Sequence, residues 1–354
     1  MEITMKNGLW KLGLCLTVLT AFLVFSMIYS LSVGVVDITW KDILHIAYGY
    51  FTGEAASLPA KDIMAADILM DLRLPRIVMA VIAGGSLALG GVVMQAVIRN
   101  PLADPYILGV SSGAALGATA SIILGSFSMF GVYGVSFGAF IGSLAVTFTV
   151  FALTFSLGGN QSITKLILAG TALNAICGSC TSMIVYLAKD VEGIRDASFW
   201  IMGSMGRATW DMLPVSFVMF CACAFFFATQ FRSLNASLLG DEAAVTLGID
   251  VAGKRKLYLV LVSLMVSSVV SAAGVIGFVG LVIPHIVRLL WGSDHVRLLP
   301  LSVLLGAIYL IWCDVFARTV LLNAEIPIGI VTSVIGGPFF LYLMMFRKYG
   351  YGER

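Results

Sequence analysis

Charged side chains are scarce in this chain: only 11% of its 354 residues are Asp, Glu, Lys or Arg, and 60% are hydrophobic. Soluble domains carry about 25% charged residues. A soluble fold of this length could not hide so much apolar surface, so we expect one integral membrane domain spanning residues 1–354. The formal net charge of +2 is too small to indicate nucleic-acid binding.

The sequence also lacks a full set of metal ligands at a typical spacing and a pattern that binds nucleotide phosphates. Its three histidines are scattered, and its six cysteines lie in apolar runs, where we expect small buried helix residues. No G-x-x-x-x-G-K-[ST] phosphate loop occurs. We therefore expect no catalytic residue, no metal site and no cofactor on this chain, and any ATP chemistry has to lie on another polypeptide.

Long apolar runs are what the chain does contain. A spanning helix needs roughly 20 apolar residues. The run that starts at Leu257 is too long for one crossing and is divided near Gly277, which leaves a short second piece. The ten predicted segments are 12–34, 76–98, 106–125, 134–157, 164–188, 212–231, 257–278, 279–292, 299–319 and 326–346.

The first apolar run, 12–34, is interpreted as a retained helix. A signal peptide has an apolar core of about 7–15 residues followed by an A-x-A-like site, and neither feature is present. The KRK cluster at 254–256 and the basic tail 347–354 favour the cytoplasm for both chain ends. The loop 37–75 is then extracytoplasmic and polar enough for the surface, and the loop 232–256 is cytoplasmic.

One polar stretch, RNPLADPYILGVSSGA at 99–114, interrupts the apolar sequence. Asn100-Pro101 ends a helix, because proline lacks a backbone donor and restricts the preceding residue. Asp104 can cap the next helix with Pro105 at its first position. Small residues follow at GxxxG spacing, which lets helices approach closely in lipid. The residues alone predict a cytoplasmic turn followed by a tightly packed helix.

This stretch belongs to a longer one, DLRLPRIVMAVIAGGSLALGGVVMQAVIRNPLADPYILGVSSGAALGA, that closely resembles the signature of the FecCD family. Members of that family are permease subunits of type II ABC importers for ferric siderophores, haem and cobalamin. Three later stretches are similar to further family segments in the expected order: LLGDEAAVTLGIDV, GVIGFVGLVIPHIVRLLWGSDHVRLLP and DVFARTVLLNAEIPIGIVTSVIGGPFFLYLM. The resemblance runs from about Asp71 to Met345. It implies an all-α integral membrane fold of about ten transmembrane helices, like that of BtuC-type ABC transporter permeases.

The resemblance also implies partners and a place in the cell. These are a second permease copy in a homodimer, two ATP-binding cassette subunits that hold ATP-Mg, and an extracytoplasmic substrate-binding protein, all at a bacterial cytoplasmic membrane. The expected mechanism is ATP-driven alternating access. Ferric siderophore is the first choice of cargo, with haem and cobalamin as alternatives, because nothing in the sequence decides between them. The residues assigned to signature turns and translocation-path helices are Arg99, Asn100, Pro101, Asp104, Pro105, Gly109, Gly113, Gly280, Pro284, Pro327 and Gly329.

The segment 238–250 is the expected contact with the ATPase. Asp241 can cap a short helix, Ala243, Ala244 and Leu247 can share one apolar face, and Gly248 can end it. The residues alone leave ATPase docking and a position on lipid headgroups equally open, and the resemblance favours docking. The residues assigned to coupling are Leu239, Gly240, Asp241, Glu242, Ala243, Ala244, Leu247 and Gly248.

Arg73, Arg76 and Arg318 lie at predicted outer helix ends, where the positive-inside rule disfavours them. The resemblance implies that they pair with acidic residues of the binding protein; the alternative is anchoring at lipid headgroups. Asp314 stands four residues before Arg318, and we expect an intrahelical ion pair rather than a substrate contact. His285 belongs to the general family signature and is not expected to ligate haem.

Two other classes are disfavoured. A secondary transporter would place several ionisable groups near the midplane, where Asp314 is almost alone. A membrane enzyme would need a convergent set of nucleophile, base or metal ligands. A third class, a purely structural subunit, would not explain why GDEAAVTLGID resembles an ATPase-docking element.

Overall fold

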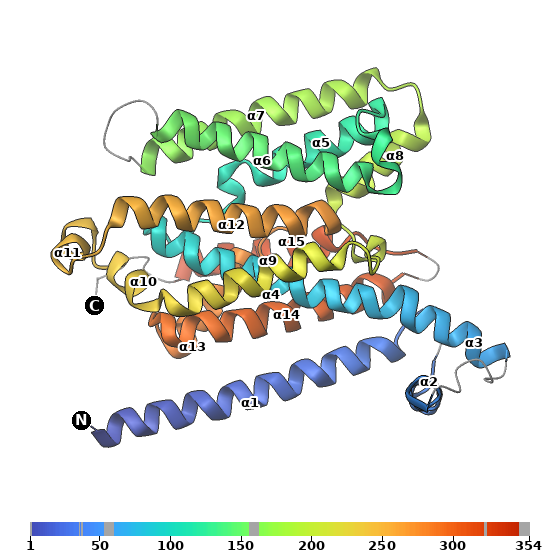
Figure 1. The fold of residues 1–354 in the computed structure, drawn as a ribbon, viewed down its shortest axis with the longest axis horizontal. Coiled ribbons are helices and arrows are strands. Elements are labelled where there is room, and N and C mark those ends of the chain that lie inside the picture. Colours follow the sequence, from blue (N-terminus) through green and yellow to red (C-terminus); the bar gives the residue numbers. More distant parts are fainter. Residues whose placement is uncertain are drawn as a thin grey trace.

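The computed structural model describes residues 2–34, 36, 38–52, 60–155, 163–321 and 324–346, and every regular element in these ranges is helical. Figure 1 shows most of the long helices side by side, with α11 at one end of the bundle and α3 at the other. The α-helices are α1 (Glu2–Ser32), α2 (Trp40–Thr52), α3 (Ala60–Asp67), α4 (Leu74–Ile98), α5 (Val110–Leu124), α6 (Gly134–Phe155), α7 (Ile163–Leu187), α8 (Val191–Met202), α9 (Leu213–Thr229), α10 (Phe231–Ser237), α11 (Asp241–Thr246), α12 (Val251–Ala273), α13 (Val279–Trp291), α14 (His295–Thr319) and α15 (Ile328–Phe346). Short turns of other types are the π-helical η2 (Ile68–Arg73) and the 3-10 helices η3 (Pro105–Leu108), η4 (Ser128–Tyr133) and η5 (Met205–Arg207).

Each predicted span has an apolar helix. Among the described residues, six helices are long and apolar enough to cross a membrane, and α9 with α10 makes a seventh that is bent by 68°. Three shorter apolar helices, α5, α13 and α15, occupy the remaining predicted segments. The all-α prediction with about ten spans is therefore confirmed.

Helix α4 is the centre of the bundle. It packs against α9, α12, α13 and α14, as the end-on views show, and 89% of its most apolar stretch is buried. Glycines permit this close packing: a Cβ on Gly84 would lie 2.1 Å from the carbonyl oxygen of Gly306, and one on Gly91 would lie 2.0 Å from that of Gly280. In a membrane the hydrophobic effect does not drive helices together, because lipid tails are as apolar as leucine. Van der Waals contacts at close backbone approach stabilise the helix packing instead.

Helices α5 to α8 form a second layer beside α12 (Figure 1). A Cβ on Gly113 would lie 2.4 Å from the carbonyl oxygen of Gly142, and one on Gly117 would lie 2.0 Å from that of Gly138. The GxxxG spacing therefore marks the contact of α5 with α6, which confirms the predicted tight packing.

The long apolar run after Leu257 breaks where the sequence predicts a division. Helix α12 ends at Ala273, Gly274 and Phe278 both have positive φ of 74° and 69°, and α13 begins at Val279. Helix α13 has 13 residues, so the second piece is short as expected.

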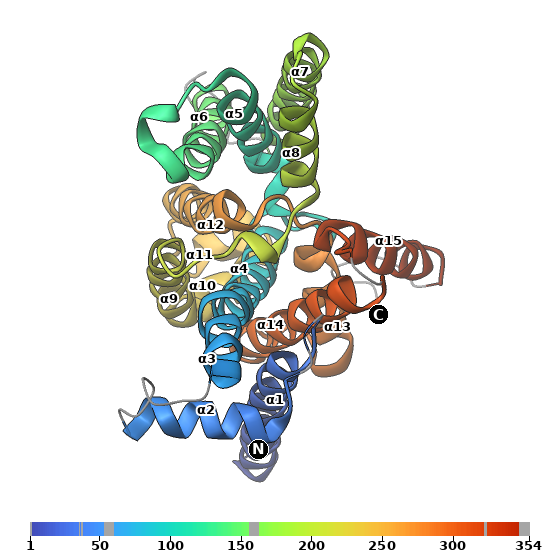
Figure 2. The ribbon, with the colours of Figure 1, turned by 90° about the vertical axis from the view of Figure 1, so that its right-hand side faces the viewer.

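The loop 37–75 differs from the prediction of a simple polar surface loop. Its described part forms α2, α3 and η2, and Ile38, Ile46, Ala66 and Leu69 make a small apolar core of their own. Figure 2 shows α2 lying across the end of α1, roughly at right angles to the bundle helices. Residues 53–59 of this loop and the basic tail 347–354 lie outside the described residues.

Candidate functional site

The signature turn forms the predicted caps, but around a different element. Asp104 accepts a hydrogen bond from the backbone N–H of Tyr106 at 2.8 Å, and Pro105 begins the 3-10 helix η3. Gly109, with φ of 83°, ends η3, and α5 begins at Val110. The capped element is therefore a single 3-10 turn, because the chain turns again at Gly109 before the helix starts.

The start of the turn is also built from local hydrogen bonds. Arg99 ends α4 in the left-handed region with φ of 53°, an uncommon conformation for a residue with a side chain. The side-chain oxygen of Asn100 accepts from the backbone N–H of Leu102 at 2.8 Å, and Pro101 lies inside this Asx turn. The predicted end of the helix before Pro101 is confirmed.

The turn is anchored inside the bundle by a contact that the sequence did not predict. The hydroxyl of Tyr106 donates to the carbonyl oxygen of Ile276 at 2.9 Å and accepts from the N–H of the same residue at 3.2 Å. Nearby, Gln95 donates to the carbonyl oxygen of Gly280 at 3.2 Å and accepts from Arg288 at 2.6 Å. The signature turn therefore contacts the α12–α13 break, so the prediction of a turn confined to the cytoplasmic surface was incomplete.

The segment that includes α11 forms a short helix, but Asp241 does not cap it. The N-cap is Gly240, with φ of 106°, and Asp241 is the first helical residue. The Asp241 carboxylate accepts hydrogen bonds from Arg255 Nη2 at 2.9 and 3.0 Å, and Arg99 Nη2 lies 3.5 Å from its Oδ1. Gly248, with φ of 79°, follows the end of the helix as predicted. We call Arg99, Asp241 and Arg255 the inner cluster.

The exposed face of this segment also differs from the prediction. Ala244 is fully buried against the bundle and Ala243 is half-buried, whereas Leu239, Val245 and Leu247 are each at least 60% exposed. The predicted face of Ala243, Ala244 and Leu247 is therefore wrong, because the bundle covers Ala244. Leu239, Val245 and Leu247 form the exposed apolar surface, and Glu242 is exposed beside it.

At the opposite end, α4 begins in a second ion-pair cluster. Arg76 Nε lies 2.8 Å from Asp314 Oδ1, and Arg76 Nη1 lies 2.8 Å from Glu325 Oε1. The side chain of Asp314 is 1% exposed and that of Glu325 is 46% exposed. Arg318 Nε lies 3.5 Å from Asp314, so the predicted i,i+4 pair is present, although Arg76 is the closer partner. We call Arg73, Arg76, Asp314, Arg318 and Glu325 the outer cluster.

The other two arginines of the outer cluster hold the end of α1. Arg318 donates to the backbone carbonyls of Ser30 at 2.7 Å and Val33 at 2.9 Å, and Arg73 donates to those of Leu31 and Val36. Arg73, Arg76 and Arg318 are all buried. The guanidinium groups of these three residues therefore already bind this chain, and their predicted role in docking the binding protein stays a prediction. A polar pocket of about 300 Å³ opens above them, with Glu325 in its wall.

The remaining signature residues are sites of close backbone packing. A Cβ on Gly329 would lie 2.3 Å from the carbonyl oxygen of Met202, and Ile328, which follows Pro327, donates to the carbonyl oxygen of Gly203 at 3.0 Å. The start of α15 is thereby attached to the end of α8. Pro284 lies inside α13.

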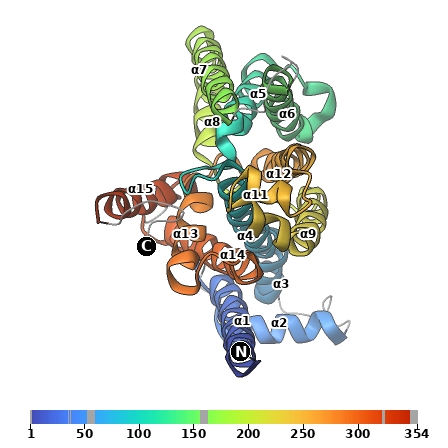
Figure 3. The same ribbon diagram turned by 90° about the vertical axis from the view of Figure 1, so that its left-hand side faces the viewer.

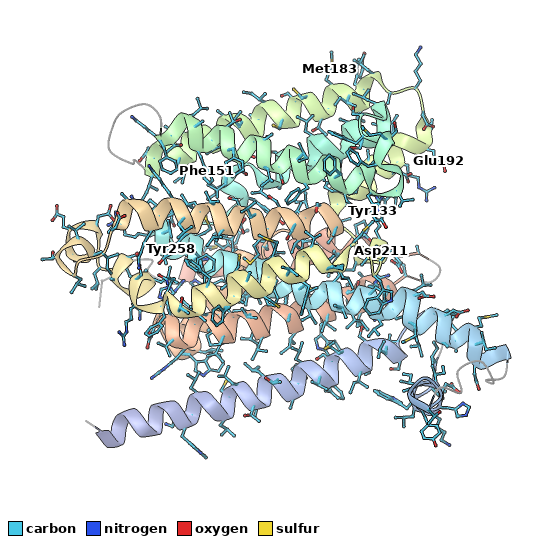
Figure 4. All side chains as sticks on the ribbon, in the orientation of Figure 1. Tyr133, Phe151, Met183, Glu192, Asp211 and Tyr258 are labelled. Carbon is cyan, nitrogen blue, oxygen red and sulfur yellow. The ribbon has the colours of Figure 1, made fainter. Side chains whose placement is uncertain are left out.

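Helix α7 is less covered than its neighbour α6: 17% of its apolar stretch is buried, against 33% for the stretch that contains α6. Figure 4 shows Met183 and Glu192 near the outer end of α7 and α8. Cys177 and Cys180 lie on α7 at CxxC spacing as free thiols; Cys180, like Cys221 on α9, is exposed. The expectation that all the cysteines are buried is therefore wrong for these two, and Cys15 on α1 is only half-buried.

The fold and the two clusters define a class. The chain is a multi-pass helical membrane subunit with three exposed apolar side chains in and beside the short helix α11 at one end, and its sequence contains no phosphate loop. Among the described residues, no group of three His, Cys, Asp or Glu side chains could hold a metal ion.

Comparison with known proteins gives the family. The model of the FecCD transport family matches residues 22–346. The hemin transport system permease protein HmuU of Yersinia pestis is 42% identical over 79% of this chain and 84% of its own length. The cobalamin import system permease protein BtuC of Halobacterium salinarum is 42% identical over 79% and 74%. A solved structure, described as an inward-facing metal-chelate type ABC transporter, superimposes with a TM-score of 0.80 and 34% identity over 94% of this chain and 98% of the other.

The chain belongs to the FecCD transport family. It is the permease subunit of a type II ABC importer, a transport component rather than an enzyme, and ATP hydrolysis belongs to separate partner subunits.

Proposed function

We propose that this chain moves a metal chelate, a ferric siderophore first of all, across a bacterial cytoplasmic membrane. The observation that carries the proposal is the membership of the FecCD family over residues 22–346. The working unit in this proposal is a homodimer with two ATP-binding cassette subunits that hold ATP-Mg and an extracytoplasmic binding protein. Both chain ends are cytoplasmic, which puts α11 inside and the outer cluster outside.

The proposed coupling runs through α11. An ATPase subunit docks on Leu239, Val245 and Leu247, whose exposed apolar side chains have no cover in this chain. When nucleotide binding moves the ATPase, α11 transmits the movement through Asp241 to Arg99 at the end of α4 and Arg255 on α12. The bundle then rocks and changes which mouth of the path is open.

The binding protein is proposed to dock over the outer pocket. Glu325 is half-exposed there beside Arg76, with Arg73 and Arg318 beneath the surface. Three arginines against two carboxylates leave the outer cluster net positive, so we propose that acidic residues of the binding protein are attracted to it, which favours register and encounter rate more than affinity.

Haem or a corrinoid is the second candidate cargo. The specific observation that favours it is the 42% identity to permeases whose names specify hemin and cobalamin. The same transporter architecture serves either cargo, so the alternative changes the substrate and not the mechanism.

The test of the cargo is an ATPase and uptake assay. The chain is reconstituted in liposomes with its ATPase subunit and its binding protein, and ferric siderophores, haemin, cobalamin and molybdate are added separately. Ferric siderophore is expected to stimulate hydrolysis and to accumulate inside. Stimulation by haemin or cobalamin alone would select the second candidate, and no stimulation by any chelate would refute the proposal.

Coupling is tested by Leu247→Arg in the same liposomes. A charge at an apolar contact that is desolvated on docking is costly, so uptake is expected to fall while the permease remains folded. The measurement is the ratio of uptake to ATP hydrolysed, with elution volume as the check on folding. Undiminished uptake would rule out Leu247 as part of the docking surface.

A further inference from the structure

A deep apolar groove lies on the flank of the bundle near the inner end. Its volume is about 560 Å³, within the range of ligand sites. Leu89 of α4 forms its floor, Ala224 and Ala228 line the α9 side, and Leu299 and Val303 line the α14 side. The two alanines are one helical turn apart, so only small side chains line the groove on its α9 side at these positions. Figure 3 shows α9 and α14 beside α4, on the side of the bundle away from α7.

The groove is bounded at its inner end by the bend between α9 and α10. The two helices meet at 68°, with Gln230 between them. Tyr258, which lies on α12 near α9 in Figure 4, donates to Gln230 Oε1 at 3.0 Å, and Lys254 donates to the same oxygen at 3.2 Å. These bonds hold the bend, which carries Phe231 of α10 to the groove wall.

Two arginines are chain neighbours of residues that line the groove. The guanidinium carbon of Arg232 lies 5.6 Å from the ring centroid of Phe231, a groove residue, and Arg297 follows the groove residue Val296. Within the described part of the chain, neither arginine forms an ion pair with a carboxylate, in contrast to Arg99 and Arg255 at the same end.

The nearby acid, Asp294, is already bound. Its Oδ1 accepts from the N–H of Val296 at 3.1 Å and from the side-chain amide of Asn235 at 2.8 Å. Asn235 also accepts from the backbone N–H of His295 at 2.9 Å, which ties α10 to the start of α14. The charges of Arg232 and Arg297 together exceed the single negative charge of Asp294, so this end of the groove has a net positive charge.

We propose that this groove is a binding site for an anionic phospholipid, with one acyl chain between α9 and α14 and the phosphate at Arg232 and Arg297. The apolar walls accept hydrocarbon, and the two arginines lie at the end where a headgroup of the adjacent leaflet would lie. Basic pockets between helices are typical sites for anionic headgroups. The headgroup preference separates this site from the general lipid surface, because any phospholipid can cover apolar helix faces.

The test uses the full-length chain in phosphatidylcholine bilayers with a trace of phosphatidylglycerol that carries a diazirine on its acyl chain. After illumination, we expect crosslinks on peptides that contain residues 224–231 and 296–304. Unlabelled phosphatidylglycerol should compete better than phosphatidylcholine by about fivefold for each arginine that reaches the phosphate. The double variant Arg232→Gln/Arg297→Gln should bring the two competitors to about equal strength.

Two matched variants keep the test decisive. Lys256→Gln removes a cation at the same end that lies over Phe155 and not at the groove, and it should leave the preference unchanged. Ala228→Trp fills the groove and should remove its crosslinks while labelling of the exposed face of α1 persists, which also reports a folded chain. Equal competition by the two lipids in the native chain, unchanged groove labelling in Ala228→Trp, or chain-to-chain crosslinks at the groove would each overturn the proposal.

Discussion

At the outer end of α4, Arg76 binds two carboxylates with shortest distances of 2.8 Å, whereas at its inner end Arg99 and Arg255 share one carboxylate, Asp241, at 3.5 and 2.9 Å. The hydrogen-bond lengths of Arg76 and Arg255 are almost the same, but the surroundings differ. Asp314 is 1% exposed, and Asp241 is 43% exposed. Arginine–carboxylate pairs therefore occur at both ends of α4, with a buried carboxylate at one end and a partly solvated carboxylate at the other.

Burial decides what each cluster can do. Breaking a buried pair leaves a charge without solvent, so the outer cluster resists rearrangement and fixes α1, α4 and α14 relative to one another. In the inner cluster the Arg255 side chain is buried, but the Asp241 carboxylate is 43% exposed, so water can replace part of its pairing as α11 moves. The outer cluster is thus suited to holding helices in fixed positions, and the inner cluster to allowing α11 to move relative to α4 and α12.

The largest effect is expected for Arg76→Ala. Removal of the guanidinium leaves the buried Asp314 carboxylate without its closest partner, which costs about 3–5 kcal/mol of unfolding free energy. The measurement is thermal unfolding of the detergent-solubilised chain, followed by size-exclusion chromatography.

The double variant Arg76→Met/Asp314→Leu is the control for this experiment. It replaces the pair by apolar side chains and should recover part of the lost stability, because such replacements are often neutral, although Arg318 loses its carboxylate and keeps only the carbonyls of Ser30 and Val33. An Arg76→Ala chain that unfolds at the native temperature would show that Arg318 alone satisfies Asp314.

A smaller loss is expected for Arg318→Met. The substitution leaves the carbonyls of Ser30 and Val33 without their donor, at about 1–3 kcal/mol, while Asp314 keeps Arg76. Because α1 is poorly covered elsewhere, its outer end should loosen first. Hydrogen exchange of the peptide that contains residues 31–34 should accelerate, and Lys189→Met, an exposed cation on the same side, should leave it unchanged. Equal exchange in both variants would remove Arg318 from the α1 anchor.

At the inner cluster, Asp241→Asn should change stability by less than about 1 kcal/mol, because the carboxylate is nearly half-exposed and the amide oxygen of asparagine can still accept a hydrogen bond from the buried Arg255. Its effect should be on coupling: the loss of the charge shared by Arg99 and Arg255 frees α11 from α4 and α12. We expect fewer chelate molecules imported per ATP hydrolysed, measured in liposomes against Glu192→Gln, an exposed acid at the other end. A destabilised chain with native coupling would reverse the contrast between the two clusters.

The same contrast explains which features the sequence predicts. Apolar runs, Asn100-Pro101, the split near Gly277 and the Gly113–Gly117 spacing are local signals, and the structure has a feature at each. Helices α2, α3 and α8 were missed because they are short or amphipathic and interrupt no long apolar run. The errors at the clusters have one cause: Asp241 has the residue type of an N-cap, but tertiary pairing with Arg255 prevails over local capping.

The outer arginines show the same limit. Their position at one end of the helices could be predicted from the order of the spans, and their burial could not. Their partners are Glu325, in a short loop before α15, and the backbone carbonyls at the end of α1, which carry no sequence signal. The single acid in NAEIP was the available indication, and its partner is 249 residues away along the chain.

The smallest effect is expected for Glu325→Gln, and it is the sharpest test of the role of burial. Arg76 donates to Glu325 at 2.8 and 3.0 Å, the same two distances at which it donates to Asp314. If distance set the energy, loss of either carboxylate would cost the same. Because the Glu325 side chain is 46% exposed and Arg76 keeps Asp314, we expect a loss below about 1 kcal/mol, several times smaller than for Arg76→Ala. Equal losses in the two unfolding experiments would mean that Glu325 is desolvated in the assembled protein, and that the outer pocket is covered rather than open to a docking partner.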